Sequence, residues 1–190
     1  MTTVTVRRPI GPAVVLGAAP VVVGMVALLA RPWFLPPGVE VAWRVTFFLA
    51  VGVVGTAWPL VRTDTPAGRR ATLAALSLGS LAFAGGRVLV DLPVGPTDLG
   101  LALALNGVAA VAEEAFFRRY LYGLLAPLGT AAAVVGSAAA FAVAHVTVWG
   151  WWVLPLDLAA GLVLSWQRAA TGRWSVPAAT HVLANSLTLV

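Results

Sequence analysis

Long apolar runs alternate along the chain with short segments that carry arginine, acidic residues, proline or glycine. Runs of about 20 residues are long enough to cross a bilayer as α-helices, and the segments between them contain turn signals. The pattern predicts an all-α protein with about seven membrane helices. The predicted spans are about Ile10–Ala30, Trp43–Val61, Ala71–Val90, Leu99–Ala126, Thr130–Trp149, Trp151–Trp166 and Ser175–Val190.

The composition of the chain supports the same class. Hydrophobic residues make up 60% of the 190 residues and charged residues only 10%, whereas soluble domains carry about 25% charged residues. The connections between the runs are too short for a soluble domain of useful size. We therefore expect a polytopic transmembrane helical bundle that acts in or at the lipid bilayer.

The charged residues predict an orientation. The net charge is +5, and all 12 basic residues are arginines. They occur singly or in pairs rather than along one helix face, so no nucleic-acid partner is expected. Cytoplasmic loops collect arginine, which predicts a cytoplasmic N-terminus. The arginines predicted on the inner side are Arg7, Arg8, Arg62, Arg69, Arg70, Arg168 and Arg173.

Two absent residue types bear on the setting and the chemistry. The chain has no lysine and is rich in alanine, valine, glycine and leucine, which suggests a GC-rich bacterial genome. We therefore expect an integral protein of a bacterial cytoplasmic membrane. The chain also has no cysteine, which excludes disulfides, thiolate zinc ligands and a cysteine nucleophile.

Three polar motifs lie inside the apolar runs, where a charged side chain costs roughly 3 kcal/mol on insertion scales. Residues four apart share one face of a helix, so each motif presents its polar groups together. The motifs lie at comparable depths in their spans, which predicts that they meet in one polar intramembrane cavity. They are Glu113-Glu114-x-x-x-Arg118, Phe141-x-x-x-His145 and His181-x-x-x-Asn185.

Two hydrolytic mechanisms are compatible with these groups. In one, Glu113 or Glu114 is the general base toward a water that His145 orients. His181 and Asn185 then donate hydrogen bonds to the oxyanion of a tetrahedral intermediate. In the other, a carboxylate and two imidazoles bind a catalytic zinc ion, with Glu113, His145 and His181 as the ligands. The residues alone do not decide between the two.

Purely structural roles are the simpler explanation of each motif taken singly. Glu114 and Arg118 can neutralise each other, and a histidine in a membrane helix often hydrogen-bonds a neighbouring helix. That explanation has to hold for three motifs at once, which makes it the less favoured one. Intramembrane Glu and His also mark ion pathways, but such a pathway gives Asn185 no role. Neither His-Glu-x-x-His, the helix motif of zincin metalloproteases, nor Gly-x-Gly-Asp occurs. Proteases that depend on either motif are therefore not expected.

The three motifs, in this order on successive helices, resemble the CPBP family, also called Abi or type II CAAX prenyl endopeptidases. The resemblance covers about Leu99–Leu189. It divides the chain into N-terminal helices at residues 1–98 and a catalytic helical core at residues 99–190. The site positions of the family correspond here to Glu113, Glu114, Arg118, His145, His181 and Asn185.

The resemblance implies an intramembrane endopeptidase that acts on a membrane-associated peptide or protein. Glu113 would be the base, Glu114 and Arg118 would support it, and His145 would lie beside the water. His181 and Asn185 would complete the site. Zinc dependence and a metal-free glutamate mechanism are equally compatible with the family. The alternative function is a non-catalytic membrane scaffold or immunity protein that keeps the family fold.

Overall fold

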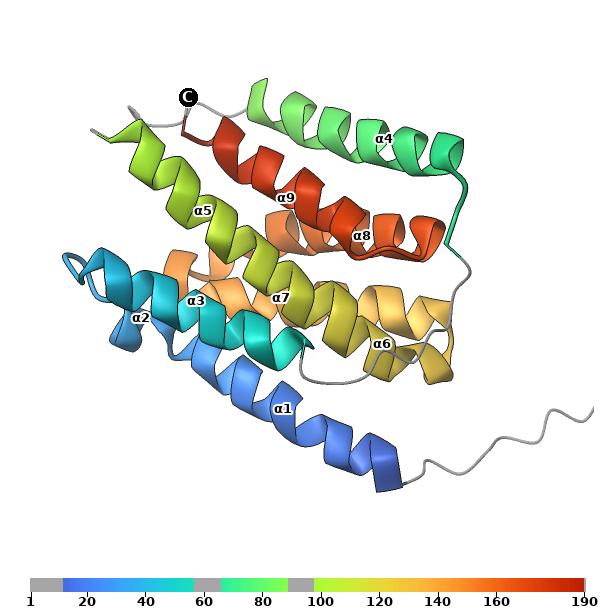
Figure 1. Ribbon diagram of the computed structural model, residues 1–190, viewed down its shortest axis with the longest axis horizontal. Coiled ribbons are helices and arrows are strands. Elements are labelled where there is room, and N and C mark those ends of the chain that lie inside the picture. Colours follow the sequence, from blue (N-terminus) through green and yellow to red (C-terminus); the bar gives the residue numbers. More distant parts are fainter. Residues whose placement is uncertain (1–11, 57–65, 89–97, 190) are drawn as a thin grey trace, which may run out of the picture.

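The computed structural model describes residues 12–56, 66–88 and 98–189, and its regular structure in those ranges is entirely helical (Figure 1). Each of the seven predicted spans overlaps one of the longer helices, which confirms the all-α prediction for the described residues. The predicted inner arginines Arg7, Arg8 and Arg62 lie outside those residues. The segments are α1 (Pro12–Leu29), α2 (Arg31–Phe34), α3 (Val41–Thr56), α4 (Arg69–Val88), α5 (Leu99–Glu114), η1 (Ala115–Leu121), α6 (Tyr122–Leu125), η2 (Ala126–Leu128), α7 (Thr130–Trp149), η3 (Trp151–Val153), α8 (Leu154–Thr171) and α9 (Ser175–Leu187).

Within the described ranges, two stretches of helix are long and apolar enough to cross a membrane. One is the continuous stretch Leu99–Leu128, with 30 residues, and the other is α7, with 20 residues. The helical stretches Gly17–Leu29 and Val41–Thr56 are apolar but shorter. That all seven helices span the bilayer therefore stays a prediction.

The long helices form a bundle with α5 running through its middle (Figure 1). α5 packs against α3 on one side and against α9 on the other, while α4 covers α9 and α8. α7 packs along α8, and α1 contacts both α7 and α3. This arrangement places the three helices that carry the polar motifs, α5, α7 and α9, in the same bundle.

Two glycines bound α7. Gly129 and Gly150 have φ angles of 111° and 89°, a left-handed backbone region that L-residues with a side chain rarely adopt. The chain therefore reverses direction at both ends of this helix. The second reversal fixes the depth of His145, which lies one turn before the C-terminal end of α7.

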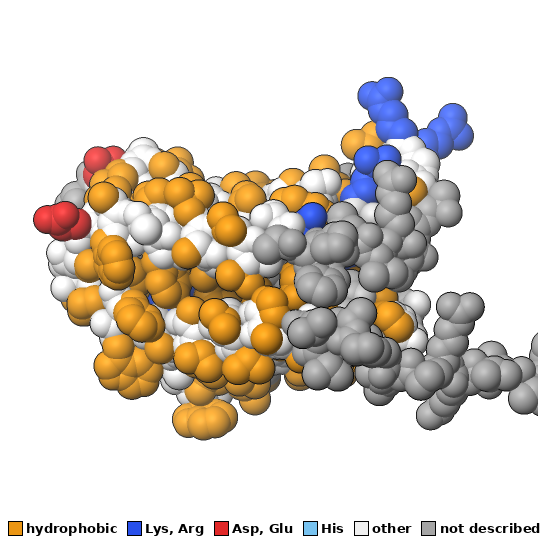
Figure 2. All heavy atoms as spheres, turned by 60° about the horizontal axis from the view of Figure 1, so that its bottom comes forward, with side chains coloured by type: hydrophobic (Ala, Val, Ile, Leu, Met, Phe, Trp, Pro, Cys, Tyr) orange, Lys and Arg blue, Asp and Glu red, His pale blue; other side chains and the backbone are white. Residues whose placement is uncertain are grey.

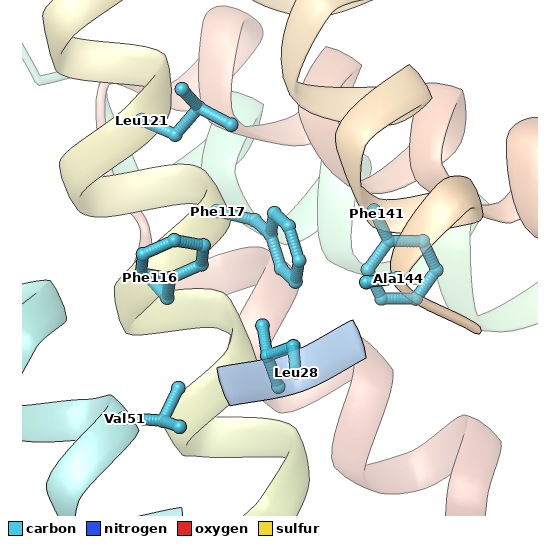
Figure 3. Close-up of a cluster of buried hydrophobic side chains, with 7 residues drawn as sticks. All are labelled: Leu28, Val51, Phe116, Phe117, Leu121, Phe141 and Ala144. Carbon is cyan, nitrogen blue, oxygen red and sulfur yellow. The ribbon is translucent and has the colours of Figure 1, made fainter. Parts of the chain in front are cut away.

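A cluster of buried hydrophobic side chains joins the N-terminal helices to the C-terminal half of the chain (Figure 3). The backbone of α3 comes so close to η1 that a Cβ on Gly55 would lie 2.4 Å from the carbonyl carbon of Ala115. This contact holds the segment after the two glutamates against α3. The cluster consists of Leu28, Val51, Phe116, Phe117, Leu121, Phe141 and Ala144.

The outer surface is apolar over most of its length. Figure 2 shows hydrophobic side chains spread over the face in view, with acidic side chains at one end and basic ones at the other. Val22, Val53, Leu81 and Val135 are each more than half exposed. An exposed apolar surface of this extent is characteristic of contact with lipid rather than water.

Candidate active site

The two adjacent glutamates lie where the helix changes type. α5 ends at Glu114, and the next seven residues, η1, form a π-helix. The sequence predicted an uninterrupted span at this point, and the π-helical turn was not foreseen. π-Helical turns are rare and occur frequently at functional sites.

Side chains of neighbouring helices bind carbonyl groups of the π-helical turn. The Ser137 hydroxyl of α7 donates to the Phe117 carbonyl at 2.9 Å. Nε of Arg168, on α8, donates to the Arg118 carbonyl at 3.2 Å. All four side chains are buried, so these bonds satisfy backbone oxygens that water does not reach and hold the wider turn in place.

Glu114, Arg118 and His181 form one buried polar group. Glu114 Oε1 accepts from Arg118 Nη1 at 2.9 Å and lies 2.9 Å from His181 Nδ1. Arg118 Nη2 also donates to the Gly161 carbonyl at 3.2 Å. The predicted pairing of Glu114 with Arg118 is confirmed, and it neutralises two charges whose side chains are fully buried. A buried charge is tolerated when it is paired and hydrogen-bonded in this way.

Glu113 lies in a second polar group with residues from α2 and α7. Its Oε1 accepts a hydrogen bond from Arg31 Nη1 at 2.8 Å. Its Oε2 lies 3.7 Å from His145 Nε2. The side chain of Glu113 is only 4% exposed, so the guanidinium supplies the counter-charge that this carboxylate needs inside the protein.

The hydrogen bond of His145 to the backbone indicates its tautomer. Nδ1 lies 2.9 Å from the Phe141 carbonyl oxygen, and because a carbonyl only accepts, Nδ1 carries the hydrogen. In the neutral ring, Nε2 is then a free acceptor that faces Glu113 Oε2. A separation of 3.7 Å is too long for a direct hydrogen bond but can be bridged by one water. Asp157 Oδ2 lies 3.9 Å from Nδ1 on the other side of the ring.

The Phe141 ring links the two polar groups. Its centroid lies 4.5 Å from the ring of His145 and 5.6 Å from that of His181. The Arg118 guanidinium lies 4.5 Å from the same ring, within cation–π distance. The predicted contact of Phe141 with His145 is confirmed, with the two rings tilted by 46°, and both histidines lie against this one aromatic side chain.

The structure brings five of the six predicted site residues into these two groups. The sixth, Asn185, is half-buried on α9 one turn after His181. Among the described residues, none forms a hydrogen bond with its side chain. The five are Glu113, Glu114, Arg118, His145 and His181.

Sequence reasoning missed two neighbours of the site. Arg31 was not among the predicted site residues, yet its side chain reaches a carboxylate 82 positions further along the chain. Asp157 was not among the predicted site residues either, and its Oδ2 lies 3.9 Å from His145 Nδ1. The available signal was that each charge lies at the edge of an apolar run, where it needs a partner.

The zinc site proposed from the sequence does not fit this arrangement. In the described ranges, no group of three or more His, Cys, Asp or Glu side chains is placed to hold a metal ion. The hydrogen bonds of Glu113 Oε1 and His181 Nδ1 involve only one polar atom of each side chain, so they do not by themselves prevent the other atom from binding a metal. Because the described donors do not converge, we derive no step through a metal, and the need for zinc is a question for the chelation experiment.

The predicted polar cavity is not confirmed either. A groove of about 440 Å³ lies between α3 and α5, and its lining is almost entirely apolar. Its lining includes Ala112 and Ala115, on either side of the two glutamates, and Trp174. The groove is therefore distinct from the Glu113–His145 pair, which packs inside the bundle.

Comparison with known families matches residues 95–187 to the type II CAAX prenyl endopeptidase Rce1-like family. This match confirms the resemblance seen in the three motifs, and all six predicted site residues lie within it. The family consists of membrane-integral proteases. No curated protein and no solved structure matches the chain.

Proposed function

Because residues 95–187 form a domain of the Rce1-like type II CAAX prenyl endopeptidase family, we propose that this protein is an intramembrane endopeptidase. It hydrolyses a peptide bond of a membrane-associated protein or peptide with an activated water. The observation that carries the proposal is the pair of acceptors, Glu113 Oε2 and His145 Nε2, 3.7 Å apart. Each lies on a stretch of helix that is long and apolar enough to cross a membrane, Leu99–Leu128 for Glu113 and Thr130–Trp149 for His145.

These two acceptors suit the activation of one water. A water between them donates one hydrogen to Glu113 Oε2 and the other to His145 Nε2, which leaves its lone pairs free for a carbonyl carbon. As the oxygen attacks, the proton passes to Glu113, which later delivers it to the leaving amine. The C–N bond breaks, and the water supplies the oxygen and one hydrogen of the new carboxyl group.

Developing charge on the carbonyl oxygen requires donors. We assign this role to the amide of Asn185, which lies on α9 one turn after His181 and has no side-chain hydrogen bond among the described residues. His181 Nδ1 lies 2.9 Å from Glu114 Oε1, and Arg118 holds that carboxylate in place, so the imidazole is fixed beside Asn185 on α9.

The setting we propose is a bacterial cytoplasmic membrane with the N-terminus inside. The first turns of α1 and α4 lie at the same end of the bundle (Figure 1). α4 begins with Arg69 and Arg70, and both are exposed. Because cytoplasmic segments collect arginine, this end is assigned to the cytoplasm.

The test compares protein termini in membranes from a deletion strain that carries the wild type, Glu113→Gln or Glu40→Gln at equal abundance. Glu40 is exposed and belongs to neither polar group of the candidate site, so Glu40→Gln is the matched control. We expect new termini with the wild type and with Glu40→Gln, and none with Glu113→Gln.

One observation favours the alternative of a non-catalytic scaffold. Each glutamate of the site already has an arginine partner, Arg31 for Glu113 and Arg118 for Glu114. Neutralised pairs of this kind also serve packing alone. Identical termini in all three strains would favour the scaffold and refute the peptidase.

A further inference from the structure

The hydrogen bond to Glu113 Oε1 comes from a part of the chain that the family match does not cover. The match begins at residue 95, whereas the donor, Arg31, is the first residue of α2 and lies 82 positions before Glu113. All six predicted site residues lie within the matched range. The N-terminal helices therefore add a side chain to a site that the matched domain otherwise supplies.

The short helix α2 holds the backbone of Arg31 in place. α2 lies at the turn between α1 and α3 (Figure 1). Pro32 stands in its first turn, where the fixed φ angle of proline suits the start of a helix. At the other end of α2, the Phe34 carbonyl accepts a hydrogen bond from the indole of Trp43, on α3, at 2.8 Å. α2 also packs against α7, the helix that carries His145.

The side chain of Arg31 is held on two sides. Its guanidinium carbon lies 5.9 Å from the centroid of the Phe48 ring, on α3, which is within cation–π distance. Its Nη1 donates to Glu113 Oε1 at 2.8 Å. Only 13% of the side chain is exposed, and a guanidinium presents its donors in a planar, rigid fork. The donor therefore has a defined position relative to the carboxylate.

This hydrogen bond decides which oxygen of Glu113 is available. Arg31 occupies Oε1, so Oε2 is the oxygen that faces His145 Nε2, at 3.7 Å. Arg118 does not take over this role, since its two terminal nitrogens bind Glu114 and a backbone carbonyl. The last torsion of a glutamate side chain has broad energy wells. Without Arg31 the carboxylate therefore rotates away from the geometry that a bridging water requires.

We propose that Arg31 is a positioning residue of the reaction, which holds Glu113 so that Oε2 and His145 Nε2 share one water. The inference rests on the proposed function for the hydrolysis itself. It extends the site beyond the family domain to the N-terminal helices. The arrangement on which it depends can also be measured without a substrate.

The first measurement is an NMR experiment on the detergent-solubilised protein. The chain contains only two histidines, so labelling with ¹⁵N-histidine gives two sets of imidazole signals, which His145→Gln assigns. Arg31→Gln should shift the signals of His145 more than those of His181, because the carboxylate that faces His145 loses its anchor. Arg44→Gln is the matched control, since Arg44 is also partly buried but donates to the Val39 carbonyl. It should leave both sets of signals in place.

The second measurement is the rate of cleavage of the membrane protein whose new terminus depends on Glu113 in the comparison of strains. A misplacement of about 1 Å costs about 100-fold in rate, so Arg31→Gln should lower kcat by about 100-fold with little change in KM. Arg31→Lys keeps the charge but not the fork, so its kcat should lie in between. Gly136→Ala crowds Leu125 nine positions before His145 on α7. It perturbs packing alone and should keep the wild-type kcat.

Three outcomes would overturn the proposal: unshifted His145 signals in Arg31→Gln, a wild-type kcat in that variant, or an equally large fall of kcat in Gly136→Ala. If Arg31→Gln does not accumulate, Arg31→Lys decides, and unshifted His145 signals with a wild-type kcat would overturn the proposal. Absence of new termini with the wild type would refute the peptidase. Cleavage by the wild type together with equal cleavage by Arg31→Gln would refute only the role of Arg31.

Discussion

Replacing Arg31 by glutamine removes the only positive charge that hydrogen-bonds the Glu113 carboxylate among the described residues, at 2.8 Å. Breaking one partner of a buried ion pair costs about 3–5 kcal/mol. Because Arg31 keeps 13% of its side chain exposed, the lower end of that range applies. Unit charges about 4 Å apart attract each other by about 4 kcal/mol at an effective dielectric constant near 20, which falls within the same range. We therefore expect Arg31→Gln to lower the free energy of unfolding by about 3 kcal/mol.

The assay is equilibrium unfolding of the detergent-solubilised protein in a double-mutant cycle with Glu113→Gln. The double variant replaces both charges with neutral amides, so it should recover about 2 kcal/mol relative to the sum of the single losses. Arg70→Gln, at an exposed arginine, is the control and should change stability by less than about 0.5 kcal/mol. A coupling energy near zero would refute the reasoning, because it would mean that Arg31 does not stabilise the buried Glu113 carboxylate.

Three further predictions follow from the site and its surroundings. Gly55→Ala should destabilise the protein by about 1–3 kcal/mol through overpacking, because the new Cβ would lie 2.4 Å from the Ala115 backbone. Gly85→Ala is the control, since its Cβ would meet no atom within 4 Å. Thermal unfolding of both variants tests this, and equal unfolding midpoints would contradict the close contact. Asn185→Ala should lower kcat about 100-fold with little change in KM, as for loss of an oxyanion donor, and an unchanged kcat in the peptidase assay would remove it from the site. Activity should survive prolonged chelation, since the described donors do not converge on one ion; loss that zinc restores would reinstate the zinc site.

The local part of the site was predictable from spacing. Residues four apart on a helix must lie on one face, so the contact of Glu114 with Arg118 and the stacking of Phe141 with His145 follow from the sequence once these segments are helical. The helices themselves follow from the apolar runs, because only hydrogen-bonded backbone is stable in lipid. The structure confirms both contacts.

The π-helical turn after Glu114 was not predictable in this way. An α-helix and a π-helix of the same residues differ in one backbone hydrogen-bond register, and no residue type selects between them locally. Here the wider turn coincides with side-chain donors from Ser137 and Arg168 and with the close approach of Gly55. These partners come from three other helices, so the choice depends on tertiary packing.

The sequence by itself determined the all-helical class, the positions of the helices and the pairs within each motif, because hydropathy and helical periodicity act over a few turns of one segment. Only the tertiary structure decided that Arg31 reaches Glu113, that His181 reaches Glu114 and that Asp157 lies beside His145. These contacts join residues that are 82, 67 and 12 positions apart. The physical reason is that a buried charge requires a partner without specifying which one, and the packing of the helices makes that selection.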